Sequence, residues 1–407
     1  MKKYALVGAG NRALHMFAKP LTDELKDQAE LVGVYDTNTH RAQQLSLQCR
    51  GVPVYNSFEE MLQRSGADEI IVASVDYTHD EYIIRALEAG LDVISEKPMT
   101  INHAKCNAIL EAENRTGNKV TVTFNARFNP YTARIKELIK EGYVGDILSV
   151  HMEWMLDTSH GADYFRRWHR YLEKSGGLLV HKSTHHFDLI NWWLEEEPLE
   201  LRAFGSRRFY GPTREKRGER CLTCNYQKEC EFYFDIREKD FHQNFYLEAE
   251  GFDGYYRDQC VFADDIDIYD TMSVNVLYSR GTQLSYSLTA HSPYEGWKVS
   301  INGTKGRLEA SNTYNGANAK ALHNEIKLFN RSGEEITIKL NKLEGSHGGS
   351  DYLLRRMLFV GDVPDRLGQM ADSRAGALSL LIGDAANISI ADNRSVKIGE
   401  LLSFAHA

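Results

Sequence analysis

The sequence lacks long apolar runs, an excess of positive charge and a dense set of cysteines. No uncharged apolar stretch approaches the roughly 18 residues of a membrane-spanning helix, and the strand-like run near Met1 is too short for a signal-peptide core. With 57 acidic and 48 basic side chains the net charge is −9, which gives nucleic acid or anionic lipid little attraction. Six cysteines in 407 residues are too sparse for a disulfide framework. We therefore expect a soluble, cytoplasmic protein that binds neither a membrane nor nucleic acid.

Residues 3–124 alternate short β-branched runs with helical stretches. The strand-like runs are KYALVG, ELVGVYD, EIIVASV, LDVISEKP and KVTVTFN. This alternation predicts parallel strands with helices on both faces, and such a sheet binds its ligand at the carboxyl ends of the strands. We interpret residues 1–124 as one α/β domain.

After Asn125 the pattern changes. DTMSVNVLY and TQLSYSLTAH alternate apolar and polar residues about Arg280-Gly281, which indicates a β-hairpin, and WKVSINGTKGRLEAS repeats the alternation. Residues 125–407 are therefore predicted to form a second α/β domain with a large, mostly antiparallel open sheet. A charged, aromatic, Cys-bearing stretch from about residue 202 to 262 has no clear period, and we interpret it as an insertion in that domain.

A glycine-rich turn, residues 8–12, follows the first strand and opens the first helix. Its first glycine permits a tight turn and its second lets backbone amides approach a pyrophosphate. The next strand ends in Asp36, which can accept ribose hydroxyl protons and would repel a 2′-phosphate. These features predict a Rossmann domain that prefers NAD to NADP, although Arg12 and Arg41 are cations that a 2′-phosphate would attract. The turn residues predicted to contact the coenzyme are Gly8, Gly10, Asn11 and Arg12.

Further motifs make the chain resemble the Gfo/Idh/MocA oxidoreductase family, which includes glucose-fructose oxidoreductase and inositol dehydrogenase. The motifs are GAGNRA, YDTNTHRA, VASVDYTHDEYIIRALEAGLDVISEKP, NARFNP, GGLLVHKSTHHFDLINWW and INGTKGRLEAS. The resemblance implies a Rossmann half followed by an α/β half whose open sheet serves in oligomerisation. It also implies transfer of hydride between a nicotinamide coenzyme and a carbohydrate.

The Glu96-Lys97-Pro98 signature ends a later strand of the first domain. The resemblance places Lys97 beside the nicotinamide and the substrate, and Glu96 at the coenzyme. A physical reason supports the role of Lys97 independently, because a cation near the carbinol oxygen stabilises alkoxide character as hydride leaves.

The segment after Gly176-Gly177 departs from the family pattern. Relatives commonly have an Asp and, four residues later, a His on one helix, whereas this chain has His181 and His185. His185 matches the catalytic His and is predicted to accept the substrate proton. His181 either binds a substrate hydroxyl or exchanges duties with His185. On a continuous helix both would share a face with Asp188, so a metal site is an alternative.

Supporting roles follow from the resemblance. The residues predicted to line the nicotinamide ribose are Ser74 and His79. Asn125 and Arg127 match the segment that enters the second domain, and Arg127 would bridge coenzyme and substrate. Trp168 lies where relatives touch coenzyme or substrate, with packing as the alternative. Lys182 adds a cation that would hold an anionic group of the substrate.

Four cysteines lie within the weakly periodic stretch, and they are Cys221, Cys224, Cys230 and Cys260. A structural zinc would explain them, because zinc binding, worth about 10 to 16 kcal/mol in small peptides, can order a segment with little core. The spacing is not a symmetric pair of CxxC motifs, so an iron–sulfur cluster and free or paired thiols stay open. His242 is an alternative to Cys260 as a ligand.

The combined prediction is an NAD-dependent oxidoreductase that acts on a secondary hydroxyl of a sugar, cyclitol or glycoside. One alternative is a glycosidase that oxidises its substrate transiently and recycles NAD, and another is a non-enzymatic NAD- or sugar-binding regulator. The expected partners are a small carbohydrate and further copies of the chain, as a homodimer or homotetramer.

Overall fold

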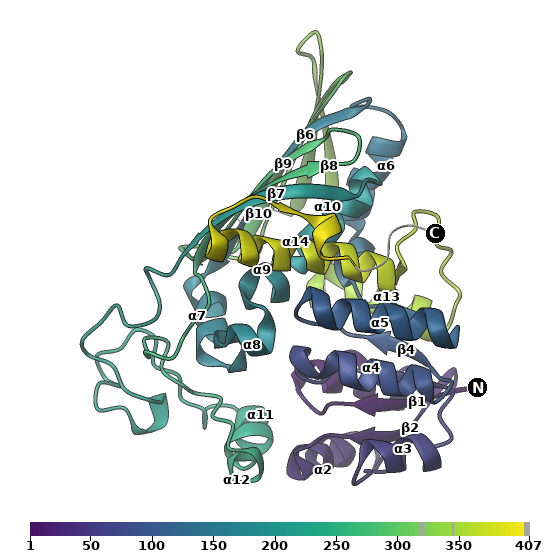
Figure 1. Cartoon of the computed structure of the whole chain (residues 1–407), viewed down its shortest axis with the longest axis vertical. Helices are drawn as coiled ribbons and strands as arrows, with labels where there is room; N and C mark the ends of the chain where they lie inside the picture. The colour runs from purple at the N-terminus through teal and green to yellow at the C-terminus, as the bar shows by residue number, and fades with distance from the viewer. Residues whose placement is uncertain (317–318, 320–321, 344–345, 403–407) are drawn as a thin grey trace.

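The computed structural model describes residues 1–316, 319, 322–343 and 346–402. Two β-sheets organise the described residues, one below the other in Figure 1. The last residues of the predicted second domain, 403–407, lie outside the described part. No helix in the described part is both long and apolar enough to span a lipid bilayer.

The first sheet has six strands in the order β14-β5-β4-β3-β1-β2. Its strands are β1 (Lys2–Val7), β2 (Ala29–Tyr35), β3 (Glu69–Val72), β4 (Asp92–Ser95), β5 (Val120–Val122) and β14 (Ala371–Asp372). All pairs are parallel except β14 with β5. β3 is buried along its whole length, as expected for a parallel strand covered on both faces.

Helices connect these strands, as the alternation predicts. The first connection begins with a π-helical turn, η1 (Ala13–Ala18). The helices are α1 (Lys19–Thr22), α2 (Thr39–Gln48), α3 (Phe58–Arg64), α4 (His79–Glu88) and α5 (His103–Thr116). The chain forms the predicted Rossmann arrangement, with the glycine-rich turn between β1 and η1.

The second sheet has nine strands in the order β13-β12-β11-β10-β6-β9-β8-β7-β15. They are β6 (Ile147–Asp157), β7 (Pro198–Ser206), β8 (Thr271–Tyr278), β9 (Gln283–Ser292), β10 (Gly296–Gly303), β11 (Gly306–Thr313), β12 (His323–Asn330), β13 (Glu335–Asn341) and β15 (Val396–Lys397). Within the described part of this second sheet only β6 and β9 pair in parallel, so the prediction of a mostly antiparallel sheet is confirmed.

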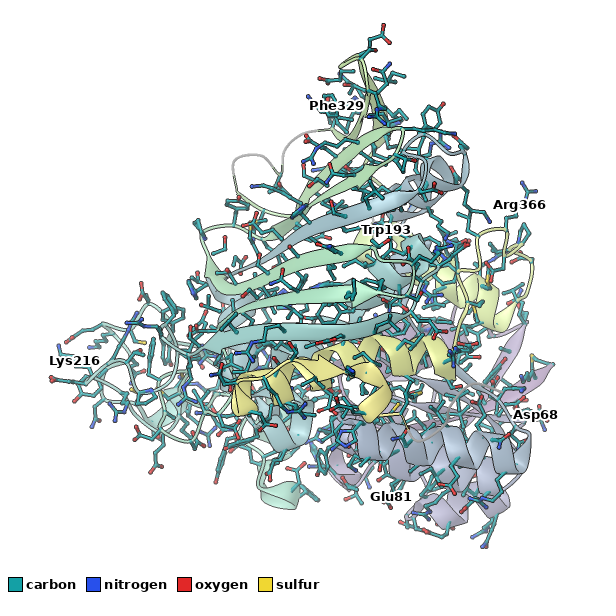
Figure 2. The ribbon with its side chains drawn as sticks, turned by 45° about the horizontal axis from the view of Figure 1, so that its top comes forward. Asp68, Glu81, Trp193, Lys216, Phe329 and Arg366 are labelled. Carbon is teal, nitrogen blue, oxygen red and sulfur yellow. The ribbon has the colours of Figure 1, made fainter. Side chains whose placement is uncertain are left out.

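Helices cover one face of this sheet (Figure 1). The helices of this half are α6 (Pro130–Lys140), α7 (Thr158–Arg166), α8 (Leu172–Ser175), α9 (Gly177–His181), α10 (Thr184–Leu194), α13 (Ser350–Phe359) and α14 (Ser373–Asp392). The long helix α14 packs against β7, α9 and α10. Trp193 of α10, labelled in Figure 2, is 1% exposed in this core.

The C-terminal part of the chain returns to the first sheet. β14 adds an edge strand to it, and the ring of Phe359 on α13 packs edge-on against Tyr4 of β1 at 5.0 Å between centroids. The two halves are therefore joined by shared core, which fixes the strand ends of the first half against helices of the second.

The residues between β7 and β8, 207–270, form the insertion. It begins later than the sequence pattern suggests, because β7 continues to Ser206. One end carries Lys216 and extends away from the labelled Asp68 and Glu81 of the first half (Figure 2). The other end contains α11 (Asp240–His242), η6 (Gln243–Leu247) and α12 (Glu250–Asp253), and lies beside α2 (Figure 1).

Candidate active site

A cleft of about 580 Å³ lies where the carboxyl ends of the first sheet's strands meet the second half. Nearly every residue predicted for coenzyme or substrate lines it. These residues are Gly8, Gly10, Asn11, Arg12, Asp36, Ser74, His79, Glu96, Lys97, Asn125, Trp168, His181, Lys182 and His185. Of the predicted coenzyme and substrate residues, Arg127 is the exception, because it is not part of the cleft wall.

The glycine-rich turn has the geometry that a dinucleotide site requires. Gly8 has φ +100°, and a Cβ there would lie 2.4 Å from the carbonyl oxygen of Ala73. No side chain fits this position, so the backbone approaches the neighbouring strand end closely. Asp36 accepts hydrogen bonds from the backbone N–H groups of Ala9 and Asn38, both at 2.7 Å. The carboxylate predicted to bind the ribose is thus fixed directly beside the turn, and the residues present fit a dinucleotide.

Both cations that a 2′-phosphate would need are already paired. Arg12 donates to Glu96 at 2.6 Å and to Asp351 at 3.0 Å. Arg41 donates to Asp253 at 2.8 Å, and another of its nitrogens lies 3.6 Å from Asp36. Arg12 and Glu96 therefore form an ion pair with each other in the cleft wall. The sequence had predicted that each contacts the coenzyme.

His79 and Asn125 also line the cleft, but much of their polar surface is engaged by protein. The His79 ring nitrogens lie 2.9 Å from the Pro98 carbonyl oxygen and 3.2 Å from that of Ser74. Asn125 donates from Nδ2 to Asp351 at 2.7 Å. His79 thus positions the loop that carries Lys97.

The predicted bridging role of Arg127 differs from what the structure shows. Its guanidinium makes two hydrogen bonds to the Asp188 carboxylate, at 2.6 and 2.8 Å, and a third to the Gly368 carbonyl. Both partners are buried, with side chains 7% and 1% exposed. Arg127 therefore ties the entry segment of the second half to α10.

Arg127→Met is expected to lower the free energy of unfolding by about 3 to 5 kcal/mol, because Asp188 would stay buried without its partner. Urea denaturation measures this loss. Arg134→Met, which breaks partly exposed pairs with Glu137 and Glu141, should cost about 1 kcal/mol or less. If Arg127→Met protein instead lost coenzyme affinity and kept the wild-type free energy of unfolding, the predicted role of Arg127 as a bridge between coenzyme and substrate would be correct.

Lys97 follows β4 and points to the second half. Its Nζ donates to the backbone carbonyl of His181 at 3.1 Å, which leaves two of its three N–H donors for other acceptors. Burial lowers the pKa of Lys97 to about 8, against the opposing charges of Asp76 and Glu96. The predicted catalytic lysine is thus held in place at the cleft.

Asp76, which the sequence reasoning missed, contacts His181. Its Oδ2 lies 2.5 Å from His181 Nδ1, and the two side chains are 5% and 12% exposed. Burial raises the pKa of Asp76, and burial with nearby positive charge lowers the pKa of His181 well below its usual value. Asp76 begins η2 (Asp76–Thr78), in the loop that follows the end of β3 at Val72, so its place after a parallel strand is the signal that would have found it.

His181 and His185 do not share one helix face, contrary to the continuous helix that we predicted. α9 ends at His181 and α10 begins at Thr184. Ser183 breaks the helix, because both its backbone N–H and its hydroxyl donate to the Leu178 carbonyl. With Asp188 paired to Arg127, the alternative of a metal bound by this trio is not supported, and no metal-holding group of three or more His, Cys, Asp or Glu occurs among the described residues.

A close helix contact sets the position of His181. Gly383 of α14 lies so near α9 that a Cβ there would be 2.2 Å from the Leu179 carbonyl oxygen. The absence of a side chain at Gly383 lets α9 approach, and His181 at its last turn then reaches Asp76 across the cleft.

Aromatic side chains surround the pair. Trp168 stacks on His169 at 3.7 Å, and the His169 ring lies 4.2 Å from that of His181. His185 lines the same cleft with its ring 6.0 Å from Phe124. Flat apolar surfaces with polar edges are typical of sites that bind sugar rings.

A second polar group that the sequence reasoning missed lies farther along the cleft. His160 Nδ1 is 2.9 Å from Glu295, and its Nε2 is 3.0 Å from the Tyr164 hydroxyl. Lys182 lies here too, with Nζ 5.2 Å from the Trp154 ring, and burial lowers its pKa. No sequence spacing connects these residues, because Glu295 comes from the β9–β10 turn.

The structural zinc predicted for the insertion is not supported. Its four predicted ligands line one small pocket, and their thiols are free. They are Cys221, Cys224, Cys230 and Cys260. The described residues hold no group of three or more ligands arranged for a metal. Arg166 donates to Cys221 Sγ at 3.0 Å and so places a cation against one thiol, while the alternative ligand His242 packs its ring against Phe234.

Comparison with known proteins decides the family. Residues 2–124 match the profile described as "Oxidoreductase family, NAD-binding Rossmann fold", and residues 136–398 match "Oxidoreductase family, C-terminal alpha/beta domain". The chain belongs to the Gfo/Idh/MocA oxidoreductase family. The predicted family and fold class are confirmed.

Individual relatives agree with this placement. The chain is 38% identical to the Bacillus subtilis (strain 168) protein named "Putative oxidoreductase YteT", over 98% of this chain and 99% of that protein. It is 29% identical to inositol 2-dehydrogenase of Acidothermus cellulolyticus over 44% of this chain and 50% of that enzyme. The WlbA dehydrogenase of Bordetella pertussis, solved with NADH and UDP-GlcNAcA, shares the fold. Its TM-score is 0.66 at 20% identity, and the match covers 97% of this chain and 98% of that one.

Proposed function

We propose that this oxidoreductase is an NAD-dependent dehydrogenase that acts on a secondary hydroxyl of a sugar, cyclitol or glycoside. The observation that carries the proposal is that Lys97 and the Asp76–His181 pair line the same cleft as the glycine-rich turn and Asp36. Relatives named as inositol and glucose-6-phosphate dehydrogenases support the class of substrate.

Backbone amides and the Asp36 carboxylate would bind the coenzyme in its half of the cleft. Amides of the turn after β1 would hold the pyrophosphate, and Asp36 would accept hydrogen bonds from the ribose hydroxyls. Arg12 and Arg41 are both paired with carboxylates, so neither is free to favour a 2′-phosphate, and NAD is the preferred form. When bound, the nicotinamide supplies the acceptor or donor of hydride.

Lys97 and His181 would act on the substrate hydroxyl. The remaining N–H donors of Lys97 polarise the oxygen and stabilise negative charge on it. His181 accepts the hydroxyl proton at Nε2, because Asp76 engages Nδ1 and thereby holds the ring. Its lowered pKa keeps the ring neutral, which is the form that accepts a proton. Relatives commonly have an Asp where this chain has His181, and Asp76 would supply the missing carboxylate from another segment.

This assignment gives His181 the role that we predicted for His185. The deciding contact is Asp76, which orients His181 and stabilises the imidazolium as it forms. His185 and Trp168, on the same cleft wall, would bind other hydroxyls or the face of the sugar ring.

The rate of oxidation is expected to fall as the pH rises through about 8, because Lys97 then loses the proton that makes it a cation. Between the lowered pKa of His181 and about pH 8, Lys97 is charged while His181 is neutral, so the rate is highest in that range. A pH profile of kcat/KM shows the alkaline limb. Lys97→Arg keeps its charge and should move the limb to higher pH at a lower rate; an unmoved limb would exclude Lys97 as its source.

A screen with NAD tests the function itself. Myo-inositol, glucose, glucose 6-phosphate and methyl glycosides are each incubated with the protein, and NADH and sugar products are followed together. NADH formed in equal amount with a keto product supports the proposal. Cleavage of a glycoside without NADH would favour transient oxidation with NAD recycling, and bound NAD without turnover of any sugar would favour a regulator.

A further inference from the structure

The insertion makes direct contacts with the segment that follows Asp36. Its backbone carbonyls at Asn244, Phe245 and Ala249 face side chains of the first half. The bonds are Asn38 Nδ2 to Ala249 at 3.0 Å, His40 Nε2 with Asn244 at 3.0 Å, and Arg41 Nε to Phe245 at 3.2 Å. These three contacts fix η6 and α12 against the N-terminal end of α2, beside which they lie in Figure 1.

Apolar packing fixes the same end of the insertion. Phe245 is fully buried in a core cluster made mainly of first-half residues. The Phe241 ring stacks on Phe245 at 4.6 Å and lies 5.9 Å from His15 of η1. Burying a Phe side chain stabilises the folded state by about 1.5 to 3 kcal/mol. The end of the insertion that contains η6 is therefore packed firmly against the first domain.

Two side chains of the docked segment enter the coenzyme part of the cleft. Tyr246 and Asp253 line it together with Asp36 and Arg41. The Tyr246 hydroxyl lies over the glycine-rich turn, 3.9 Å from where a Cβ of Gly10 would be, and its ring is 5.5 Å from the Arg41 guanidinium. Asp253 accepts a hydrogen bond from Nη2 of Arg41 at 2.8 Å.

We propose that the insertion completes the adenosine end of the coenzyme site and that Asp253 is a specificity residue for NAD over NADP. The inference rests on the proposed function, since it requires a dinucleotide in the cleft. Arg41 is the cation best placed beside Asp36 to meet a 2′-phosphate. Asp253 binds Nη2 of Arg41, whereas Asp36 lies nearest Nη1. Asp253 thus adds a second carboxylate, so a 2′-phosphate would meet negative charge and a cation that is already paired.

The test compares the affinities of NAD and NADP by equilibrium dialysis. Asp253→Asn is expected to raise the ratio of NADP affinity to NAD affinity by about tenfold or more, because Arg41 gains freedom and one charge is removed. Asp253→Glu, which keeps the charge, should retain the wild-type ratio. Glu229→Gln removes an exposed carboxylate of the same insertion, paired with Lys216, and should also leave the ratio unchanged.

A double variant tests the route through Arg41. Asp253→Asn combined with Arg41→Gln is expected to lose the gained NADP affinity; a gain that persists would overturn the role given to Arg41. An unchanged ratio in folded Asp253→Asn protein, while the wild type binds NAD, would overturn the inference and leave the proposed function standing. Failure of the wild type to bind either coenzyme would refute the proposed function itself.

Discussion

Replacing Lys97 with methionine is expected to lower kcat by roughly 10² to 10⁴. Methionine keeps most of the length of the side chain but removes the ammonium that polarises the substrate oxygen. The coenzyme affinity should change much less, because the proposal assigns most of that binding to Asp36 and the turn after β1, which line the same cleft. Steady-state kinetics beside a coenzyme titration separates the two effects.

Lys298→Met is the matched control for this change. Lys298 lies on β10 with its side chain 59% exposed, so the same substitution removes a charge that has no part in the cleft. We expect its kcat to stay at the wild-type value. A Lys97→Met protein that turns over as fast as the wild type would remove Lys97 from the mechanism.

Asp76→Asn is the second substitution with a large expected effect, a fall in kcat of roughly 10² to 10⁴. An amide does not stabilise the imidazolium that forms when His181 takes the proton, and it can turn the ring by offering a donor to Nδ1. Combining Asp76→Asn with His181→Gln should cost little more than either change alone, because the two residues act as one unit.

Asp80→Asn serves as the control, four residues along the chain. Asp80 pairs with Lys105 at 2.8 Å and is not part of the cleft wall, so its loss should leave kcat unchanged. The assignment of His181 would be wrong if His185→Gln abolished turnover while Asp76→Asn had no effect. His185 would then be the proton acceptor that the family spacing implies.

The coenzyme half of the site was predictable because its signals are local. The turn at residues 8–12 follows a buried strand, and the end of each parallel strand lies at the same edge of the sheet. Asp36 and Lys97 each follow such a strand, so their positions in the sequence indicate a common cleft. The mostly antiparallel second sheet was predictable for a similar reason, since alternation with period two is a local pattern.

The Asp76–His181 pair, to which we assign proton transfer as a proposal, was not predictable because it joins residues 105 positions apart in the chain. Its formation depends on the break at Ser183, where neither a proline nor a glycine marks the end of α9. It depends also on the approach of α9 to Gly383, which only the packed structure reveals. The three hydrogen bonds that join the insertion to the start of α2 end at backbone carbonyls, which every sequence has, so no residue pattern predicts these bonds.

Calorimetric titration of the coenzyme-stripped wild-type protein with NAD tests the central claim most directly. That claim is that the cleft between the glycine-rich turn, Lys97 and the Asp76–His181 pair is a nicotinamide coenzyme site. We predict saturable heat that corresponds to one NAD per chain, and much weaker binding by Asp36→Ala protein. Folded wild-type protein that gives no saturable heat with NAD would contradict it.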